Sequence, residues 1–186
     1  MNTAEHICPW WLGYLLVSPL RRLGQNPTKI LSPYIKQGMI VLDVGCGMGF
    51  FSLDMARLTG KDGKVICVDM QEKMMASLIK RASKAGLLEY IDHRICSKDS
   101  LNLEDMKEGI DFALAFAIVH EVPDAEVFFR QIHFALKLNG TLLFSEPKGH
   151  VSEKNFQNTV TIAEEAGFKS LETPYVMRNR SVLLKK

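Results

Sequence analysis

The chain has 186 residues, of which 47% are hydrophobic and 24% charged, and its formal net charge is +2. This length and apolar content are typical of one globular domain with a sizeable core. The small positive balance excludes the strongly basic surface typical of nucleic-acid binding, so we expect no nucleic-acid partner.

The first 29 residues carry an apolar stretch that precedes any strand–helix alternation. Its aromatic residues are Trp10, Trp11 and Tyr14. The stretch is far shorter than the ~20 residues that span a bilayer, and no basic leader precedes it, so we expect neither a membrane span nor a signal peptide. It is interpreted either as a helix packed on the domain or as a membrane-surface helix flanked by Arg21 and Arg22.

Two periodicities alternate after this stretch. Short apolar runs predict buried strands at 39–44, 64–69, 90–96, 110–119 and 141–146. Apolar residues at helical spacing predict helices near 49–58, 74–85, 123–135 and 156–166. The runs at 168–173 and 180–185 have only a polar turn between them, which predicts an antiparallel hairpin at one edge.

This alternation predicts an α/β fold, a doubly wound parallel sheet with right-handed crossovers and helices on both faces. Ligands of such sheets bind beyond the carboxyl ends of the strands, where the strand order reverses. The first predicted strand is followed directly by the turn 45–49, which therefore should lie at the ligand site.

The turn contains Gly45, Gly47 and Gly49. Glycine leaves room for a ligand against the backbone and allows positive φ. A dinucleotide motif, Gly-x-Gly-x-x-Gly, would need a further glycine where the chain has Phe50. Asp69 ends the second strand, where a carboxylate can accept both hydroxyls of a ribose. The pattern predicts a nucleoside-containing ligand and leaves an NAD-dependent oxidoreductase as a disfavoured alternative.

Four segments, VLDVGCGMGFFSLDMA, VICVD, DFALAFAIVHEV and ALKLNGTLLFSEP, together resemble class I S-adenosylmethionine-dependent methyltransferases. The resemblance is greatest to the branch of small-molecule, quinone and arsenite methyltransferases. It covers residues 30–186 and implies a Rossmann-like, seven-stranded sheet of order 3-2-1-4-5-7-6 with an antiparallel last strand. It also implies S-adenosyl-L-methionine as cofactor, S-adenosyl-L-homocysteine as product, and residues 1–29 as a helical lid segment.

The resemblance implies a cofactor role for a set of residues at the strand ends. Asp43 would lie near the methionine amino group and Asp69 at the ribose. The other expected cofactor residues are Gly45, Cys46, Gly47, Gly49, Met70, Cys96, Ser97, Lys98, Phe116 and Ala117. The adenine loop reads CSKDS where similar proteins often carry Gly-Asp-Ala, so the side chain that meets the adenine amine stays open.

Methyl transfer from a sulfonium is an in-line displacement, so the protein must mainly align the reactants and exclude water. A base is needed only if the acceptor loses a proton. His120 is the expected base because it follows the fourth strand. The residues expected around the acceptor are Trp10, Trp11, Tyr14, Glu121, Glu146 and His150. No Asn/Asp-Pro-Pro-Tyr segment is present, which favours a small-molecule acceptor over an amide or adenine.

No metal site is expected, because HEVPD has Asp124 where His-Glu-x-x-His needs a second histidine. The scattered cysteines Cys8, Cys46, Cys67 and Cys96 favour reduced thiols in a cytoplasmic protein. A non-catalytic S-adenosylmethionine-binding module remains the alternative to an enzyme. The acceptor and the oligomeric state are not predicted.

Overall fold

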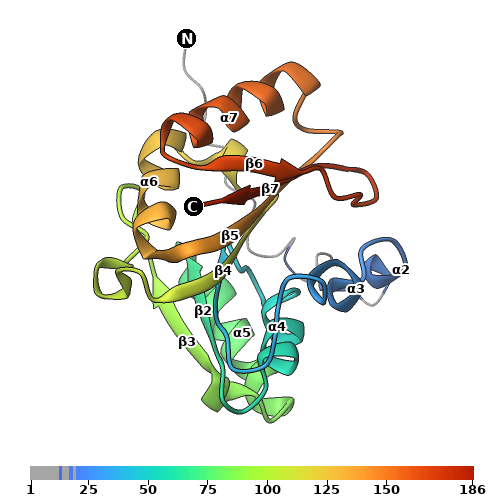
Figure 1. Ribbon diagram of the computed structural model, residues 1–186. Coiled ribbons are helices and arrows are strands. Elements are labelled where there is room, and N and C mark those ends of the chain that lie inside the picture. The colour runs from blue at the N-terminus through green and yellow to red at the C-terminus, as the bar shows by residue number, and fades with distance from the viewer. Residues whose placement is uncertain (1–12, 14–16, 19) are drawn as a thin grey trace.

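The computed structural model describes residues 13, 17, 18 and 20–186. The strands are β1 (Ile40–Val44), β2 (Lys64–Asp69), β3 (Ile91–Ile95), β4 (Ile110–Phe116), β5 (Leu136–Pro147), β6 (Lys169–Glu172) and β7 (Asn179–Lys185). The α-helices are α2 (Arg21–Gly24), α3 (Pro27–Leu31), α4 (Ser52–Thr59), α5 (Glu72–Lys84), α6 (Ala125–Ala135) and α7 (Glu153–Glu165). The 3-10 helices are η2 (Leu88–Tyr90), η3 (Glu104–Met106) and η4 (Val119–Glu121). Figure 1 shows helices alternating with strands from β1 onward.

The seven strands form one sheet of order β3-β2-β1-β4-β5-β7-β6. β1 to β5 are parallel to one another, and β7 runs antiparallel between β5 and β6. This topology confirms the predicted doubly wound α/β fold and its hairpin at one edge. The strand order reverses between β1 and β4, so a crevice is expected beyond their carboxyl ends.

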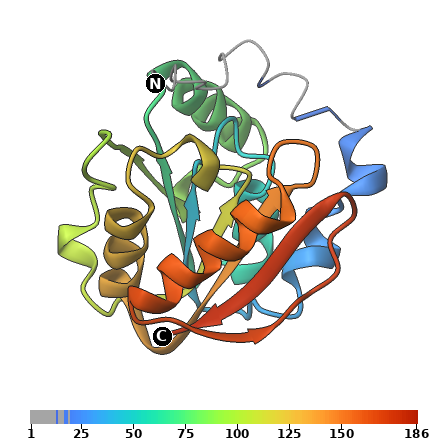
Figure 2. The same cartoon turned by 90° about the horizontal axis from the view of Figure 1, so that it is seen from above.

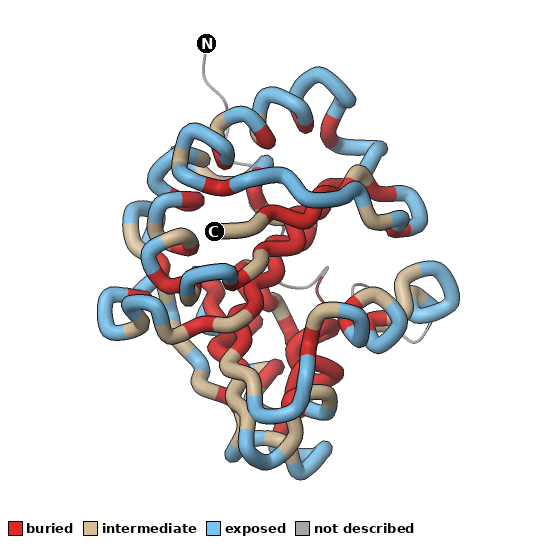
Figure 3. The backbone as a smooth tube through the Cα atoms, in the orientation of Figure 1, coloured by how far each residue is buried: buried red, intermediate tan, exposed pale blue. Residues whose placement is uncertain are grey.

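Helices cover both faces of the sheet (Figure 2). One face packs Val41, Val65 and Phe112 with residues of α3, α4 and α5. The other packs Leu42 and Ile66 with residues of α6 and α7. Successive residues of a strand point to opposite faces, so a strand covered on both sides must be apolar throughout. Figure 3 shows the resulting buried band along the strands and the exposed outer side of α7.

Three element boundaries differ from the predictions. β4 ends at Phe116 rather than at residue 119, because Ala117 has a positive φ of 57° and η4 follows. α4 begins at Ser52 rather than at residue 49, because Gly49 has a φ of 78° and cannot continue a helix. β5 begins at Leu136 rather than at residue 141, with a register shift in its pairing with β4.

Side-chain hydrogen bonds hold α2, and Gln25 directly after it, against the rest of the domain. Arg22 Nη2 donates to Asp54 Oδ1 at 2.8 Å, and Gln25 Nε2 donates to Asn179 Oδ1 at 2.9 Å. The expected boundary between the N-terminal segment and the domain, at residues 29 and 30, falls inside α3. The lid role of residues 1–29 stays a prediction. Within the part of the chain that the structure describes, no helix is long and apolar enough to cross a bilayer.

Candidate active site

A cavity of about 900 Å³ lies at the carboxyl ends of β1, β2 and β4. Its wall contains eleven of the expected cofactor residues, namely Asp43, Gly45, Cys46, Gly47, Asp69, Met70, Cys96, Ser97, Lys98, Phe116 and Ala117. Of the expected catalytic and acceptor residues, His120 and Glu121 also line it. Gly49, Glu146 and His150 do not line it, and Trp10, Trp11, Tyr14 and Cys8 lie outside the described residues.

The three glycines of the turn are needed for different reasons. All have positive φ, of 71°, 54° and 78° in chain order. A Cβ on Gly45 would lie 2.6 Å from the Ile118 side chain, and one on Gly49 would lie 3.1 Å from Leu78. A Cβ on Gly47 would meet no protein atom within 4 Å, and this residue lines the cavity. Close ligand approach is a prediction for all three glycines; packing is a further reason for glycine at positions 45 and 49, and of the three only Gly47 has open space where its Cβ would be.

Asp43 is an almost fully buried carboxylate at the end of β1. Ser52 Oγ donates to Asp43 Oδ2 at 2.5 Å. Burial raises the pKa of Asp43 to about 7, and the neighbouring Asp69 charge adds to this. The hydrogen bonds from the Ser52 side chain and backbone and the charge of Arg21 oppose the rise. Asp43 lines the cavity, so in its ionised form it can attract a cation that enters there.

The backbone holds Asp69 in one orientation. Its Oδ2 accepts the Gly47 N–H at 2.8 Å, and its Oδ1 accepts the Gln71 N–H at 2.8 Å. Burial raises the pKa of Asp69, whereas hydrogen bonds from the backbone N–H groups of Gln71, Gly47 and Met70 lower it. A carboxylate can accept about four hydrogen bonds, so Asp69 keeps capacity to accept one from a hydroxyl. The glycine turn and the acidic end of β2 thus form one hydrogen-bonded unit.

Arg21 is a cavity residue that the sequence did not predict. Its guanidinium carbon lies 4.2 Å from the Phe50 ring centroid and 5.8 Å from that of Phe116. Burial lowers the pKa of Arg21 to about 10, so it remains charged at neutral pH. The sequence interpretation placed Arg21 at a possible membrane surface, whereas in the structure this side chain lines the cavity. A cation and the Asp43 carboxylate together line a space complementary to an amino-acid zwitterion.

The loop after β3 and helix α6 enclose the far end of the cavity. Gln131 of α6 accepts the Leu101 N–H at 2.7 Å and donates to the Asp99 carbonyl at 3.1 Å, which pins the loop. Val127 and Phe128 of α6 add apolar wall. The sequence analysis predicted a helix over this segment but did not identify Gln131 as a site residue. An apolar slot of this kind suits a flat heteroaromatic ring.

His120 and Glu146 form a pair at the mouth of the cavity. His120 Nδ1 and Glu146 Oε2 are 2.7 Å apart, and the His120 backbone N–H donates to Glu146 Oε1 at 3.2 Å. Glu146 is only 1% exposed, and its hydrogen bond raises the pKa of His120. Nδ1 is thereby engaged, and the remaining nitrogen, Nε2, lies 3.9 Å from Glu121 Oε1. Glu146 thus lies behind His120, and His150 is exposed with its ring 5.8 Å from the His120 ring.

Two further features concern redox state and metals. Cys46, Cys67 and Cys96 are free thiols. Across residues 13, 17, 18 and 20–186, no group of three or more His, Cys, Asp or Glu side chains could hold a metal ion.

Comparison with known proteins identifies related chains. The chain is 31% identical over 145 residues to the ubiquinone biosynthesis O-methyltransferase of Bradyrhizobium diazoefficiens, covering 78% of this chain and 53% of that protein. It is 28% identical over 144 residues to the arsenite methyltransferase of Aquipseudomonas alcaligenes, covering 74% and 42%. The chain thus spans about half the length of these curated relatives.

The fold has close structural neighbours. A crystal structure of an S-adenosylmethionine-dependent methyltransferase from Aquifex aeolicus superposes with a TM-score of 0.85 at 23% identity, covering 96% of this chain and 98% of that one. The sequence profile of the methyltransferase domain family matches residues 35–178, which include every strand of the sheet except β7. The chain belongs to this methyltransferase domain family.

Proposed function

We propose that this protein transfers the methyl group of S-adenosylmethionine to a small-molecule acceptor. The observation that carries this proposal is the unit formed by Gly47 and Asp69 beside Asp43. Gly47 presents bare backbone to the cavity, and its N–H holds the Asp69 carboxylate that faces the same space. A nucleoside whose sugar carries two hydroxyls and whose tail carries an ammonium group fits these donors and acceptors.

Each part of the cofactor has a matching set of residues. The Asp43 carboxylate would accept the ammonium group, and Arg21 would hold the carboxylate of the same amino acid. Asp69 would accept the ribose hydroxyls. The slot between the 96–101 loop and α6 would take the adenine, with Cys96, Ser97 and Lys98 at its edge.

The bound cofactor supplies an activated methyl group, so the chain's own work is alignment and exclusion of water. Phe116 and Ala117, which line the cavity at the end of β4, would form the floor under the methyl group. Ala117 keeps its positive φ because its N–H donates to the Ser145 carbonyl at 2.8 Å. The floor is therefore fixed by β5.

His120 is the proposed base on the acceptor side. With Nδ1 held by Glu146, Nε2 is the nitrogen that can take a proton from an acceptor hydroxyl. Glu146 acts here as a positioning residue, because it holds one tautomer and stabilises the imidazolium that forms. The two relatives described above are named for an oxygen and an arsenic acceptor. A positioned base is useful only for an acceptor that loses a proton, so we favour a hydroxyl compound as the acceptor.

Two other functions are less well supported. An NAD-dependent oxidoreductase would need space at position 50, but the Phe50 ring is buried and packs edge-on against Phe51 at 5.1 Å. A non-catalytic binding module would have no use for a histidine held by a buried carboxylate.

We also propose that Trp10, Trp11 and Tyr14 close over the acceptor. For the cellular location we propose the cytoplasm, which the three free thiols support because it is a reducing compartment.

The test is a screen with S-adenosylmethionine radiolabelled on the methyl group, run on hydroxylated, thiol and arsenite acceptors. We expect label on a hydroxylated compound and S-adenosylhomocysteine in equal amount by mass spectrometry. Cofactor binding without transfer to any acceptor class would instead favour the non-catalytic module. Replacing the three N-terminal aromatic residues by alanine should reduce transfer more than cofactor binding, and equal activity would overturn the lid role.

A further inference from the structure

An exposed apolar surface lies where α2 meets the connection between β6 and β7. We call it the α2 patch, and its residues are Leu20, Leu23, Tyr175 and Met177, which are 75%, 85%, 87% and 44% exposed. The two segments lie side by side in Figures 1 and 2. They are in contact, since a Cβ on Gly24 would lie 3.1 Å from the Met177 sulfur, and Gln25 Nε2 donates to the Met177 carbonyl at 3.5 Å. Large apolar side chains gathered at this exposure mark an interaction surface rather than scattered surface residues.

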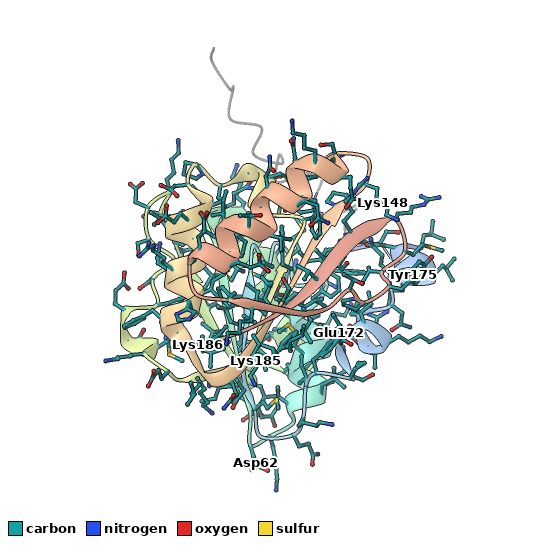
Figure 4. The ribbon with its side chains drawn as sticks, turned by 45° about the horizontal axis from the view of Figure 1, so that its top comes forward. Asp62, Lys148, Glu172, Tyr175, Lys185 and Lys186 are labelled. Carbon is teal, nitrogen blue, oxygen red and sulfur yellow. The ribbon has the colours of Figure 1, made fainter. Side chains whose placement is uncertain are left out.

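The surroundings of the α2 patch are basic. Residues 20–29, 147–150 and 172–180 together contain six Arg or Lys residues and one acid, Glu172. Arg21 lines the cavity, and Arg22 and Arg180 pair with Asp54 and Glu153. The exposed cations that remain near the patch are Lys29, Lys148 and Arg178. Lys148 and Arg178 come together because the Lys148 N–H donates to the Arg178 carbonyl at 2.9 Å, and among the described residues neither forms an ion pair. Figure 4 shows Tyr175 beside α2, with Lys148 on the same flank. Positive charge is thus concentrated around an apolar surface.

The α2 patch also adjoins the proposed site. Leu20 and Leu23 are on the same helix as Arg21, which lines the cavity. Residues three apart on a helix share one side, so Leu20 and Leu23 project together while Arg21 points elsewhere. α2 therefore has a cavity side and an exposed apolar side.

We propose that the α2 patch docks the protein on an anionic lipid surface. Apolar side chains ringed by Lys and Arg are the combination that enters the interface of an anionic bilayer, whereas a protein partner would not by itself need a ring of one sign of charge. Docking would bring the α2 end of the cavity next to the lipid. The binding is peripheral, since it uses side chains on a short helix and a strand connection.

The test is co-sedimentation of the full chain with phosphatidylcholine vesicles, with and without phosphatidylglycerol. We expect binding to the anionic vesicles, at least about tenfold loss for L23E and Y175E, and about fivefold loss each for K148Q and R178Q. L138E is the matched control, because Leu138 is 76% exposed in β5, outside the patch, and this variant should bind like the native chain. S-adenosylhomocysteine binding checks that each variant is folded and is independent of docking.

Three results would overturn the proposal. The first is no difference between the two kinds of vesicle, and the second is equal loss in L138E and L23E. The third is a dimer in gel filtration that L23E and Y175E dissociate, which would make a second copy the occupant of the patch.

Discussion

The two halves of the cavity are built in different ways. On the β1–β2 side, Asp69 is held by main-chain N–H groups of the glycine turn and of Gln71, all close to the strand ends that carry them. On the β4–β5 side, His120 is held by Glu146 from a different strand, and Ala117 has a strained φ. The first half depends on local backbone geometry and the second on contacts between distant segments. We therefore expect substitutions in the first half to affect cofactor binding and those in the second to affect transfer.

The largest effect should come from the acceptor side. H120N should lower kcat for the acceptor found in the screen by about 10²- to 10⁴-fold, the usual contribution of a positioned base. Its affinity for S-adenosylhomocysteine should stay unchanged. A variant with normal kcat would show that no base is needed, as for an acceptor that attacks without losing a proton.

E146Q tests the same pair by its pH dependence. Glu146 raises the pKa of His120, so the neutral, base-competent ring is present only above a pKa higher than the usual 6.5. The kcat of the native chain should therefore fall as the pH drops through that value. In E146Q the loss of the negative charge should shift this limb to lower pH and reduce kcat. A pH profile that does not move would exclude a positioning role for Glu146.

On the cofactor side, G47V should lower cofactor affinity by about 100-fold or more, since the side chain fills the space the ligand needs and the φ is unfavourable for a branched residue. G86V is the matched control. Gly86 has a φ of 67°, and its Cβ would meet nothing within 4 Å, but it does not line the cavity. G86V should therefore introduce similar backbone strain, seen as a similar loss of thermal stability, and should bind the cofactor normally. Equal binding by both variants would make the turn purely structural.

A smaller loss is expected for D69A. Hydrogen bonds to a charged group contribute about 1–3 kcal/mol, so the affinity should fall by about 5- to 150-fold. Part of this loss arises because the Gly47 and Gln71 N–H groups also lose their acceptor. D99A, which leaves the Asp99 backbone carbonyl bond to Gln131 in place, is the comparison and should bind normally.

The smallest expected effect is on the pH dependence of binding. The pKa of Asp43 is about 7 in the free protein, and only its ionised form attracts an ammonium group. Cofactor affinity should therefore weaken as the pH falls below 7, by up to about tenfold per pH unit, and binding at pH 7 should release about half a proton per site. Calorimetry in two buffers of different ionisation enthalpy measures that proton, and no release would contradict the role of Asp43.

Short-range patterns in the sequence predicted the strand–helix alternation and placed the glycine turn and Asp69 at strand ends, whereas the strand order was implied by the family resemblance. The Gly45–Gly49 turn and Asp69 each follow a strong apolar run, and the crossover rule then places them together. Arg21 could not be predicted in this way, since its place depends on the bond between Arg22 and Asp54, 32 residues apart. Gln131 likewise reaches the 96–101 loop only after α6 has packed. The strained φ of Ala117 is enforced by β5, and an alanine in a sequence gives no indication that its φ will be positive.

Titration calorimetry with S-adenosylhomocysteine and with NAD tests the central claim most directly. The claim is that the unit of Asp43, Gly47 and Asp69 recognises an adenosyl amino acid. We predict saturable one-to-one binding of S-adenosylhomocysteine that G47V abolishes and G86V keeps, with no heat from NAD. Saturable binding of NAD, with none of S-adenosylhomocysteine, would contradict the account.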